Sequence, residues 1–211
     1  MDATPGLAPG DRRARRRAET IEEILRLALE IMSDVGAGGL TFAELARRLG
    51  VRPPSLYKYF DSVLAIYDQL FRRGQREHLE AVRTAMSDAE PGAPAIVAGL
   101  QAGGGWATHH PTLAQLLFWR PVPGFEPSPE AFAPSLDMVD LFRQALHDAA
   151  QSGQIDADLA SEETLALLSV IAAGVRSQYL ANEPGAPLAR SRFFNLIPRA
   201  VASILTAPTS G

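Results

Sequence analysis

The segment GVRPPSLYKYF, residues 50–60, gathers side chains that are well suited to contacting a polyanion. Two adjacent prolines follow Arg52, and two tyrosines flank Lys58, which is the only lysine in the chain. Cationic groups and phenolic hydroxyls donate hydrogen bonds to phosphate oxygens, and an arginine or lysine can also bind the edge of a guanine. The segment therefore favours contact with a nucleic acid over covalent chemistry.

Groups that support catalysis or metal binding are sparse. The chain has no cysteine, so it has no disulfide, thiolate zinc site or cysteine nucleophile. It has no Gly-x-Ser-x-Gly motif, no phosphate-binding glycine loop and no paired-histidine metal motif. His109 and His110 are adjacent, so on a helix they point about 100° apart, and no acidic cluster completes a metal site. We expect no metal and no cofactor. An all-α enzyme that uses His110 with Asp137 or Asp140 is an alternative that no motif favours.

Composition and charge limit the class of protein. The chain has 211 residues, of which 46% are hydrophobic, enough for one substantial core. Residues 1–60 hold 10 basic and 8 acidic side chains, whereas residues 61–211 hold 10 basic and 16 acidic ones. A basic N-terminal part on an acidic body fits a polyanion-binding head or a solvated arm. No apolar run reaches the roughly 18 residues of a membrane span, and no secretory signal is visible, so we expect a cytoplasmic protein without a membrane partner.

Residues 12–61 contain the signals that would position the 50–60 segment. Apolar residues at three- and four-residue steps predict an amphipathic helix over residues 20–35, which the glycines at 36, 38 and 39 end. The five arginines between residues 12 and 17 lead into this helix. Residues 1–11 are rich in Gly, Pro and Asp, and we expect them to be disordered.

A second, short helix is predicted to begin at Thr41, because Thr41 and Glu44 have the spacing of a capping box. Gly50 ends this helix, and Pro53 suits the first position of a third helix that runs to about Phe60. Two short helices joined at a glycine turn form a helix-turn-helix. Its expected buried face consists of Leu45, Leu49, Val51 and Leu56.

The rest of the chain is predicted to be a helical body over residues 62–206, which makes an all-α protein of about nine helices. No alternating strand pattern is visible. The five prolines between residues 120 and 134 predict an extended loop. The predicted body helices cover residues 62–88, 94–107, 111–119, 129–152, 160–182 and 188–206.

The stretch LTFAELARRLGVRPPSLYKYFDS, residues 40–62, resembles the DNA-binding signature of the tetracycline-repressor (TetR) family. The resemblance covers roughly residues 15–70. It implies an all-α homodimer with an N-terminal DNA-reading head and a variable C-terminal body that binds a small-molecule effector. It also makes a repressor that binds a double-stranded operator the default function. A DNA-binding protein without an effector is the alternative in the same class.

The resemblance and helix-turn-helix geometry assign DNA contacts to the third helix and its flanks. Arg52 would sit at the N-cap, where its charge opposes the helix dipole by about 0.3–1 kcal/mol, and a phosphate or guanine edge would remove that conflict. Leu56 and Phe60 are expected in the core. The family positions that match Tyr57 and Lys58 usually bind phosphate. The expected DNA-contacting residues are Arg52, Pro53, Pro54, Ser55, Tyr57, Lys58, Tyr59, Thr41 and Arg17.

One position departs from the family pattern. Family members often have a lysine shortly after the Phe-x-Ser that precedes the fourth helix, and here Val63 occupies it. One phosphate contact is therefore missing. Backbone N–H groups at that helix start or the arginines of residues 12–17 can compensate.

The body should hold the effector among its helices. The segment WATHHPTLAQLLFWRP, residues 106–121, looks like the tryptophan and His-Pro segment of some family branches. For each residue expected to bind the ligand, plain packing in the core is the alternative role. Arg176 lies in an otherwise apolar segment. It would either pair with a ligand carboxylate or be solvated or ion-paired within the protein, and we favour the solvated or ion-paired role. The expected ligand-binding residues are Trp106, His110, Leu113, Leu117, Phe118, Trp119, Met138, Phe142 and Tyr179.

The last two predicted helices carry more apolar surface than a small body needs, so we expect them to form a homodimer. The apolar residues of this predicted interface are Leu165, Leu168, Ile171, Ala172, Val175, Phe193, Phe194, Leu196, Ile197, Val201, Ile204 and Leu205.

Overall fold

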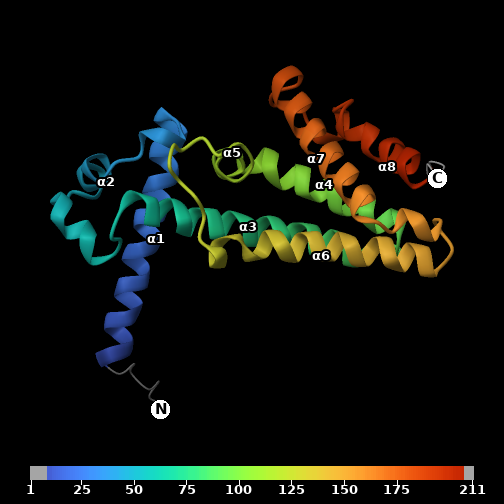
Figure 1. The fold of residues 1–211 in the computed structure, drawn as a ribbon. Coiled ribbons are helices and arrows are strands. Elements are labelled where there is room, and N and C mark those ends of the chain that lie inside the picture. Colours follow the sequence, from blue (N-terminus) through green and yellow to red (C-terminus); the bar gives the residue numbers. More distant parts are fainter. Residues whose placement is uncertain (1–8, 207–211) are drawn as a thin grey trace, which may run out of the picture.

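The computed structural model describes residues 9–206, and all regular secondary structure in that range is helical (Figure 1). Eight α-helices and five short 3-10 helices occur there. The all-α prediction is confirmed, and the eight α-helices plus the 3-10 helix η2, Pro53–Lys58, account for the nine helices expected. Residues 1–8, most of the arm predicted to be disordered, lie outside the described residues.

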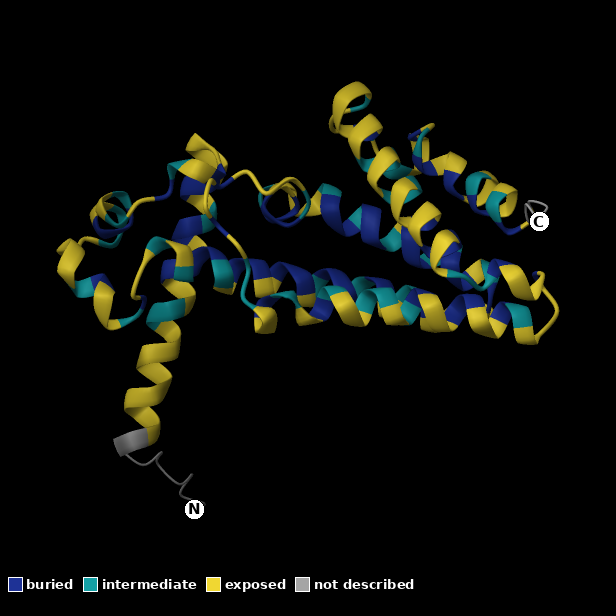
Figure 2. Ribbon diagram, in the orientation of Figure 1, coloured by how far each residue is buried: buried dark blue, intermediate teal, exposed yellow. Residues whose placement is uncertain are grey.

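The head contains four helical elements: α1 (Pro9–Val35), η1 (Ala37–Gly39), α2 (Phe42–Leu49) and η2. The helix α1 begins well before the predicted residue 20, because the arginine-rich segment continues the same helix. Its N-terminal half projects away from the rest of the molecule, and its residues 11–19 are exposed (Figure 2). This half of α1 therefore presents the arginine run on a solvated helix.

The body is built on two long helices that lie side by side, α3 (Val63–Ser87) and α6 (Pro129–Gln151) (Figure 1). The helix α4 (Ala93–His109) packs against both of them, and α5 (Pro111–Trp119) joins α4 to the head side. The C-terminal helices α7 (Glu162–Asn182) and α8 (Ile197–Leu205) pack against α4 and against each other. The 3-10 helices η3 (Ala157–Leu159), η4 (Leu188–Arg190) and η5 (Phe194–Leu196) lie in the connections.

Two boundaries differ from the sequence predictions. The proline-rich loop ends at Ser128 rather than at residue 134, whereas α6 begins at the predicted residue 129. Ser128 caps α6 by accepting a hydrogen bond from Ala131 N (3.1 Å), and Pro129 takes the first helical turn. Pro134 then lies inside α6. The predicted single helix over 188–206 is wrong, because the buried Ser191 accepts a hydrogen bond from Phe194 N (3.3 Å) and so starts a new turn within the stretch.

The buried residues form two clusters that meet along α3. One cluster joins the head to the first half of α3, to α5 and to the loop after it, with Ile31, Leu45 and Leu70 fully buried in it. The other cluster lies among α4, α6, α7, α8 and the end of α3. Because α3 contributes to both clusters, a displacement of α3 in the body would also move the head.

Candidate nucleic-acid interface and body cavity

The turn between α2 and η2 has the geometry that its sequence predicts. Thr41 is the N-cap of α2, and its Oγ1 accepts a hydrogen bond from Glu44 N (3.2 Å). Gly50 ends α2 in the left-handed conformation (φ 68°), and Val51 N donates to Ala46 O across the turn (3.0 Å). Val51 itself is 44% exposed, so its predicted burial is wrong. The turn fixes the direction in which η2 leaves α2.

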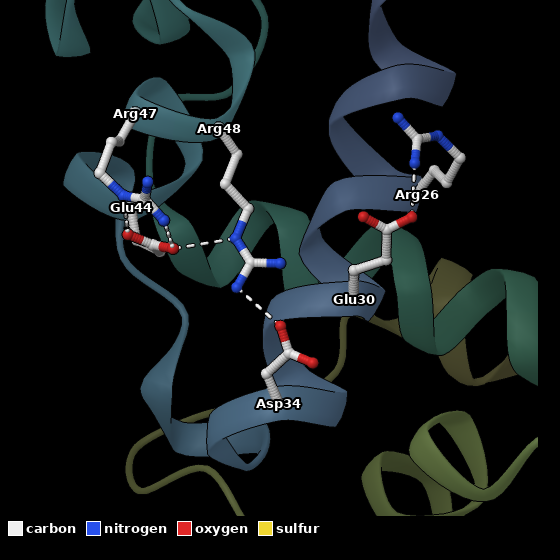
Figure 3. Close-up of polar contacts among 6 residues, drawn as sticks. All are labelled: Arg26, Glu30, Asp34, Glu44, Arg47 and Arg48. Atoms are coloured by element: carbon white, nitrogen blue, oxygen red, sulfur yellow. Dashed lines mark hydrogen bonds and ion pairs between the residues drawn. The ribbon is translucent and has the colours of Figure 1, made fainter.

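The Glu44 carboxylate does not complete the capping box but binds two arginines of its own helix (Figure 3). It accepts hydrogen bonds from Arg47 (2.7 Å) and Arg48 (2.9 Å), and Arg48 also pairs with Asp34 of α1 (2.7 Å). The hydrogen bond from Arg47, followed by that from Arg48, lowers the pKa of Glu44 to about 2. This network ties α2 to α1 and leaves both arginines paired within the head.

The third element of the motif is a 3-10 helix rather than the α-helix implied by the prediction. Arg52 is its N-cap and makes no side-chain capping bond, while Ser55 N donates to Arg52 O (2.9 Å) in the i to i+3 pattern. Pro53 and Pro54 occupy the first turn and, lacking N–H groups, donate no backbone bond there. Leu56 and Phe60 are buried, as predicted, and hold η2 on the head.

The predicted DNA-contacting residues form the outer face of the head. Arg52, Pro53, Pro54, Tyr57, Lys58 and Thr41 are exposed, and Ser55 and Tyr59 are half-buried. Within residues 9–206, neither Arg52 nor Lys58 takes part in an ion pair. Tyr57 packs edge-on against the ring of Phe42, with ring centroids 4.9 Å apart. The face therefore offers two unpaired cations and a fixed phenol.

Arg17 connects α1 to the end of η2. Its guanidinium donates to Lys58 O (2.6 Å) and lies 5.3 Å from the centroid of the Tyr59 ring. The side chain is thus engaged with the protein at the edge of the predicted interface. Contact between Arg17 and DNA remains a prediction.

The body contains a partly enclosed cavity of about 250 Å³ between α3, α4, α5, α6 and α7. Four of the nine predicted ligand-binding residues line it, namely Leu117, Phe118, Met138 and Phe142. The remaining lining residues include apolar groups such as Val82, Leu100 and Leu165. The cavity is smaller than the roughly 300–1,000 Å³ of drug-sized sites, which suits a small effector.

The other five predicted ligand-binding residues lie outside the lining of this cavity. Trp106 stacks on His110, with centroids 4.9 Å apart, beside a shallow surface groove. Trp119 and Tyr179 line a separate cavity of about 40 Å³, and Leu113 is buried in the core shared with the head. Their predicted contacts with a ligand remain predictions.

Sequence reasoning missed the polar groups of the cavity that lie on α3. Gln75 and His78 are both buried, at 5% and 9% exposure, and line the cavity one turn apart. They interrupt the apolar stripe of α3, which includes Phe71 and Val82, and that interruption is the signal that would have found them.

Arg176 also lines the cavity, and of its two favoured roles the ion pair is not formed within residues 9–206. It is half-buried, forms no ion pair within the described range, and its buried Nε has no hydrogen-bond partner. Its guanidinium lies 4.0 Å from the centroid of the Phe118 ring. Burial lowers the pKa of Arg176 to about 10. Burial, and then the charge of Arg176, lower the pKa of His78 to about 4, so the imidazole is neutral at pH 7.

Two further features bear on the class of protein. In the part of the chain that the structure describes, no group of three or more His, Asp or Glu side chains could hold a metal ion. The helix α7 is long and apolar enough, by length and composition alone, to cross a membrane, although no apolar run of that length was predicted. Only 22% of its most apolar window is buried in the protein, so most of this helix lies on the surface.

The fold and the head together define an all-α protein with an N-terminal helix-turn-helix head and a helical body. Residues 24–70 match the family described as bacterial regulatory proteins, tetR family. The tetracycline repressor protein class C of Escherichia coli is 49% identical over 49 residues, which are 23% of this chain and 22% of the repressor. Residues 24–70 of the head are therefore similar to the DNA-binding part of tetR-family regulators.

Similarity also extends beyond the head. The HTH-type transcriptional regulator Rv1816 of Mycobacterium tuberculosis (strain ATCC 25618 / H37Rv) is 32% identical over 127 residues, 59% of this chain and 53% of that one. This chain thus matches about half of that regulator's length. The crystal structure of putative regulatory protein SCO4313 has the same fold, with a TM-score of 0.73 and 21% identity over 97% of this chain and 100% of that one.

Proposed function

We propose that the protein is a ligand-responsive transcriptional repressor of the cytoplasm. It binds a palindromic operator as a homodimer, and a small effector with an apolar body releases it from the DNA. The observation that carries this proposal is the exposed, unpaired pair of cations on η2, Arg52 and Lys58, presented by a rigidly capped turn. An N-terminal helix end in a major groove, with flanking phosphate contacts, is how this motif reads DNA. Its relative in Escherichia coli is named as a repressor.

A chain of aromatic contacts supports communication between cavity and head. Phe132 lines the cavity and stacks on Phe71, with ring centroids 6.3 Å apart. Phe125 lies next to both Phe71 (6.1 Å) and Tyr67 (5.8 Å). The Tyr67 hydroxyl donates to Ala37 O, at the junction of α1 and α2. A ligand that displaces Phe132 would therefore act on the head through packed side chains of α3 and the loop before α6.

The exposed face of α7 supports the homodimer. Leu167 and Val170 are 43% and 66% exposed, and Gly174, one turn further on, has open space around its α-carbon. These residues lie at i, i+3 and i+7, so they form one stripe along α7. Leu165 and Leu168 of the predicted interface instead pack inside the body, as do Ile197 and Val201 of α8. We place the interface on the outer stripe of α7, with Leu196 at its edge.

The cavity favours an effector-responsive regulator over an effector-independent DNA-binding protein, because two of the helices that line it, α3 and α5, also contribute to the core shared with the head. A regulator that only binds DNA needs no such space.

Selection from a pool of random duplexes tests the DNA-binding part of the proposal. We expect enrichment of an inverted repeat whose half-sites are one helical turn apart, about 10 base pairs, because two heads of a dimer read successive major grooves. Affinity for the enriched duplex should fall steeply with salt. Recovery of no sequence above the starting pool would contradict the proposal.

A further inference from the structure

The cavity in the body carries a single formal charge, and that charge is unbalanced. Its polar lining consists of Gln75, His78, Ser135, Ser169 and Arg176, and no aspartate or glutamate is among the lining residues. His78 is neutral at pH 7 because burial and the nearby guanidinium hold its pKa at about 4. The cavity therefore has a net positive charge within an otherwise apolar wall.

Arg176 is held in this environment without the partner that a guanidinium normally has. Its Nε is buried and makes no hydrogen bond, and no acidic side chain of residues 9–206 pairs with it. Its guanidinium lies over the face of the Phe118 ring, 4.0 Å from the ring centroid. A partly buried, unpaired charge is unfavourable, and an anionic ligand would offset that penalty. The side chain is thus positioned for a negative group that the protein does not supply.

We propose that the effector is a small amphipathic carboxylate whose anionic group binds the Arg176 guanidinium and whose apolar part fills the rest of the cavity. Carboxylates match the planar guanidinium through two parallel hydrogen bonds, and Nε is one of the donors that such pairing uses. His78 lines the same cavity, and its ring centroid lies 5.4 Å from that of Phe118, which Arg176 also contacts, so we expect it to be within reach of the same anion. This inference rests on the proposed function, of which it specifies the ligand class.

The apolar part of the ligand would lie against Leu100, Met138 and Phe142. Phe118 and Phe132 lie at the head side of the cavity, and Phe132 begins the aromatic contacts that lead to Tyr67. A carboxylate drawn to Arg176 would therefore place its neighbouring atoms beside the side chains that connect the cavity to the head.

The test uses three probes that share one apolar chain and differ only in the headgroup, namely octanoate, 1-octanol and octylamine. Binding is measured by calorimetry with the full-length protein and with Arg176→Met, which keeps an unbranched apolar stem and removes the charge. Arg83→Met is the control, because Arg83 is exposed on α3 and pairs only with Glu80 among the described residues. Octanoate should bind the wild type and the control equally and bind Arg176→Met about 10- to 100-fold more weakly, as expected for a lost charge-assisted pair.

The comparison among probes separates charge recognition from apolar binding. We expect 1-octanol to bind weakly and with the same affinity to wild type and Arg176→Met, and octylamine not to bind the wild type. We also expect Arg176→Met without ligand to melt at a higher temperature than wild type, because an unpaired buried charge is removed, which shows that the variant folds. An NMR titration of His78 should show its pKa rising when octanoate binds.

The inference is overturned if octanoate fails to bind the wild type, or if octanoate and 1-octanol bind alike and Arg176→Met changes neither. Failure of the proposed function would look different. Octanoate would then bind in an Arg176-dependent way and leave the affinity for a selected operator unchanged, so the anion site would stand while the switch would not.

Discussion

At the scale of single residues, ion pairing divides the cations of the head into two groups. Arg47 and Arg48 are held by Glu44 and Asp34 and contribute to the structure of the motif (Figure 3). Arg52, which has no such partner within the described part of the chain, lies at the N-terminal end of η2. Because a cation there opposes the helix dipole, its presence is better explained by a contact with DNA than by stability.

We expect Arg52→Ala to change the sequence preference of the protein. If Arg52 binds a guanine edge, the variant should lose about 1–3 kcal/mol of discrimination at one base pair of each half-site and keep its preference elsewhere. Competition titrations with single-base-pair variants of the selected duplex measure this. A uniform loss over all variants would mean that Arg52 binds only phosphate.

The shifted pKa of His78 predicts how the free energy of unfolding changes with pH. Its pKa is about 4 in the folded protein, against the ordinary 6.5, chiefly because it is buried. Between these values the unfolded chain binds more protons than the folded one, so the free energy of unfolding falls as the pH drops from about 6.5 towards 4. The contribution of His78 is fully present above pH 6.5, and about 2 kcal/mol of it is lost by pH 5.

Urea denaturation of the wild type and His78→Gln at pH 7.5 and pH 5 isolates this contribution. The variant should lose less stability than the wild type over this interval, by about 2 kcal/mol. Equal losses in the two proteins would show that His78 titrates normally.

At the scale of elements, the head depends on the turn at Gly50. Its φ of 68° is strained for residues with a β-carbon, and a β-carbon added there would meet no atom within 4 Å. We therefore expect Gly50→Ala to destabilise the protein by about 1 kcal/mol through backbone conformation alone. Gly50→Asn should cost less, because asparagine tolerates the left-handed region. Chemical denaturation measures both, and an equal cost for the two variants would point to a different cause.

The elements that the sequence predicts well are those set by local chemistry. Thr41 caps its helix as its spacing indicates, and Gly50 takes the predicted turn. The 3-10 form of η2 was not predictable, because prolines at the first turn suit both helix types. The break at Ser191 was missed because its hydroxyl accepts from Phe194 N and donates to Glu183 (2.6 Å), and spacing alone indicates neither hydrogen bond.

The cavity shows the limit of local signals. Leu117 and Phe142, which line the cavity, were predicted as ligand-binding residues because bulky apolar residues gather near breaks in the helical pattern. Arg176 was assigned to solvent or an ion pair, since a sequence does not show which charges lie within reach of it. Its proximity to His78, nearly 100 positions earlier in the chain, results from the packing of α7 against α4, which brings both side chains to one cavity.

At the scale of the whole molecule, the described chain leaves one long apolar helix on its surface. The outer side of α7 is mostly exposed (Figure 2), and Leu167 and Val170 lie on it. A helix of this composition needs a covering surface, and the second copy of a symmetric dimer supplies one. The two heads would then lie on the same side of the assembly, as a palindromic operator requires.

We expect Val170→Glu to convert the dimer to a monomer, because two carboxylates would meet at the symmetry axis in an apolar interface. The control is Leu136→Glu, since Leu136 is similarly exposed, at 56%, but lies on α6. Light scattering should give the dimer mass for the wild type and the control, and the monomer mass for Val170→Glu. A wild-type monomer at micromolar concentration would contradict the assembly.

The central claim is that η2 binds operator DNA, and a salt titration of operator affinity tests it most directly. Fluorescence anisotropy would follow a selected duplex binding to wild type, Lys58→Ala and Arg83→Ala from low to physiological salt. We predict that Lys58→Ala binds all duplexes more weakly and that the slope of log affinity against log salt falls by about one unit, as for one lost phosphate contact, while Arg83→Ala matches the wild type. Identical affinity and identical slope for Lys58→Ala and wild type would contradict the claim.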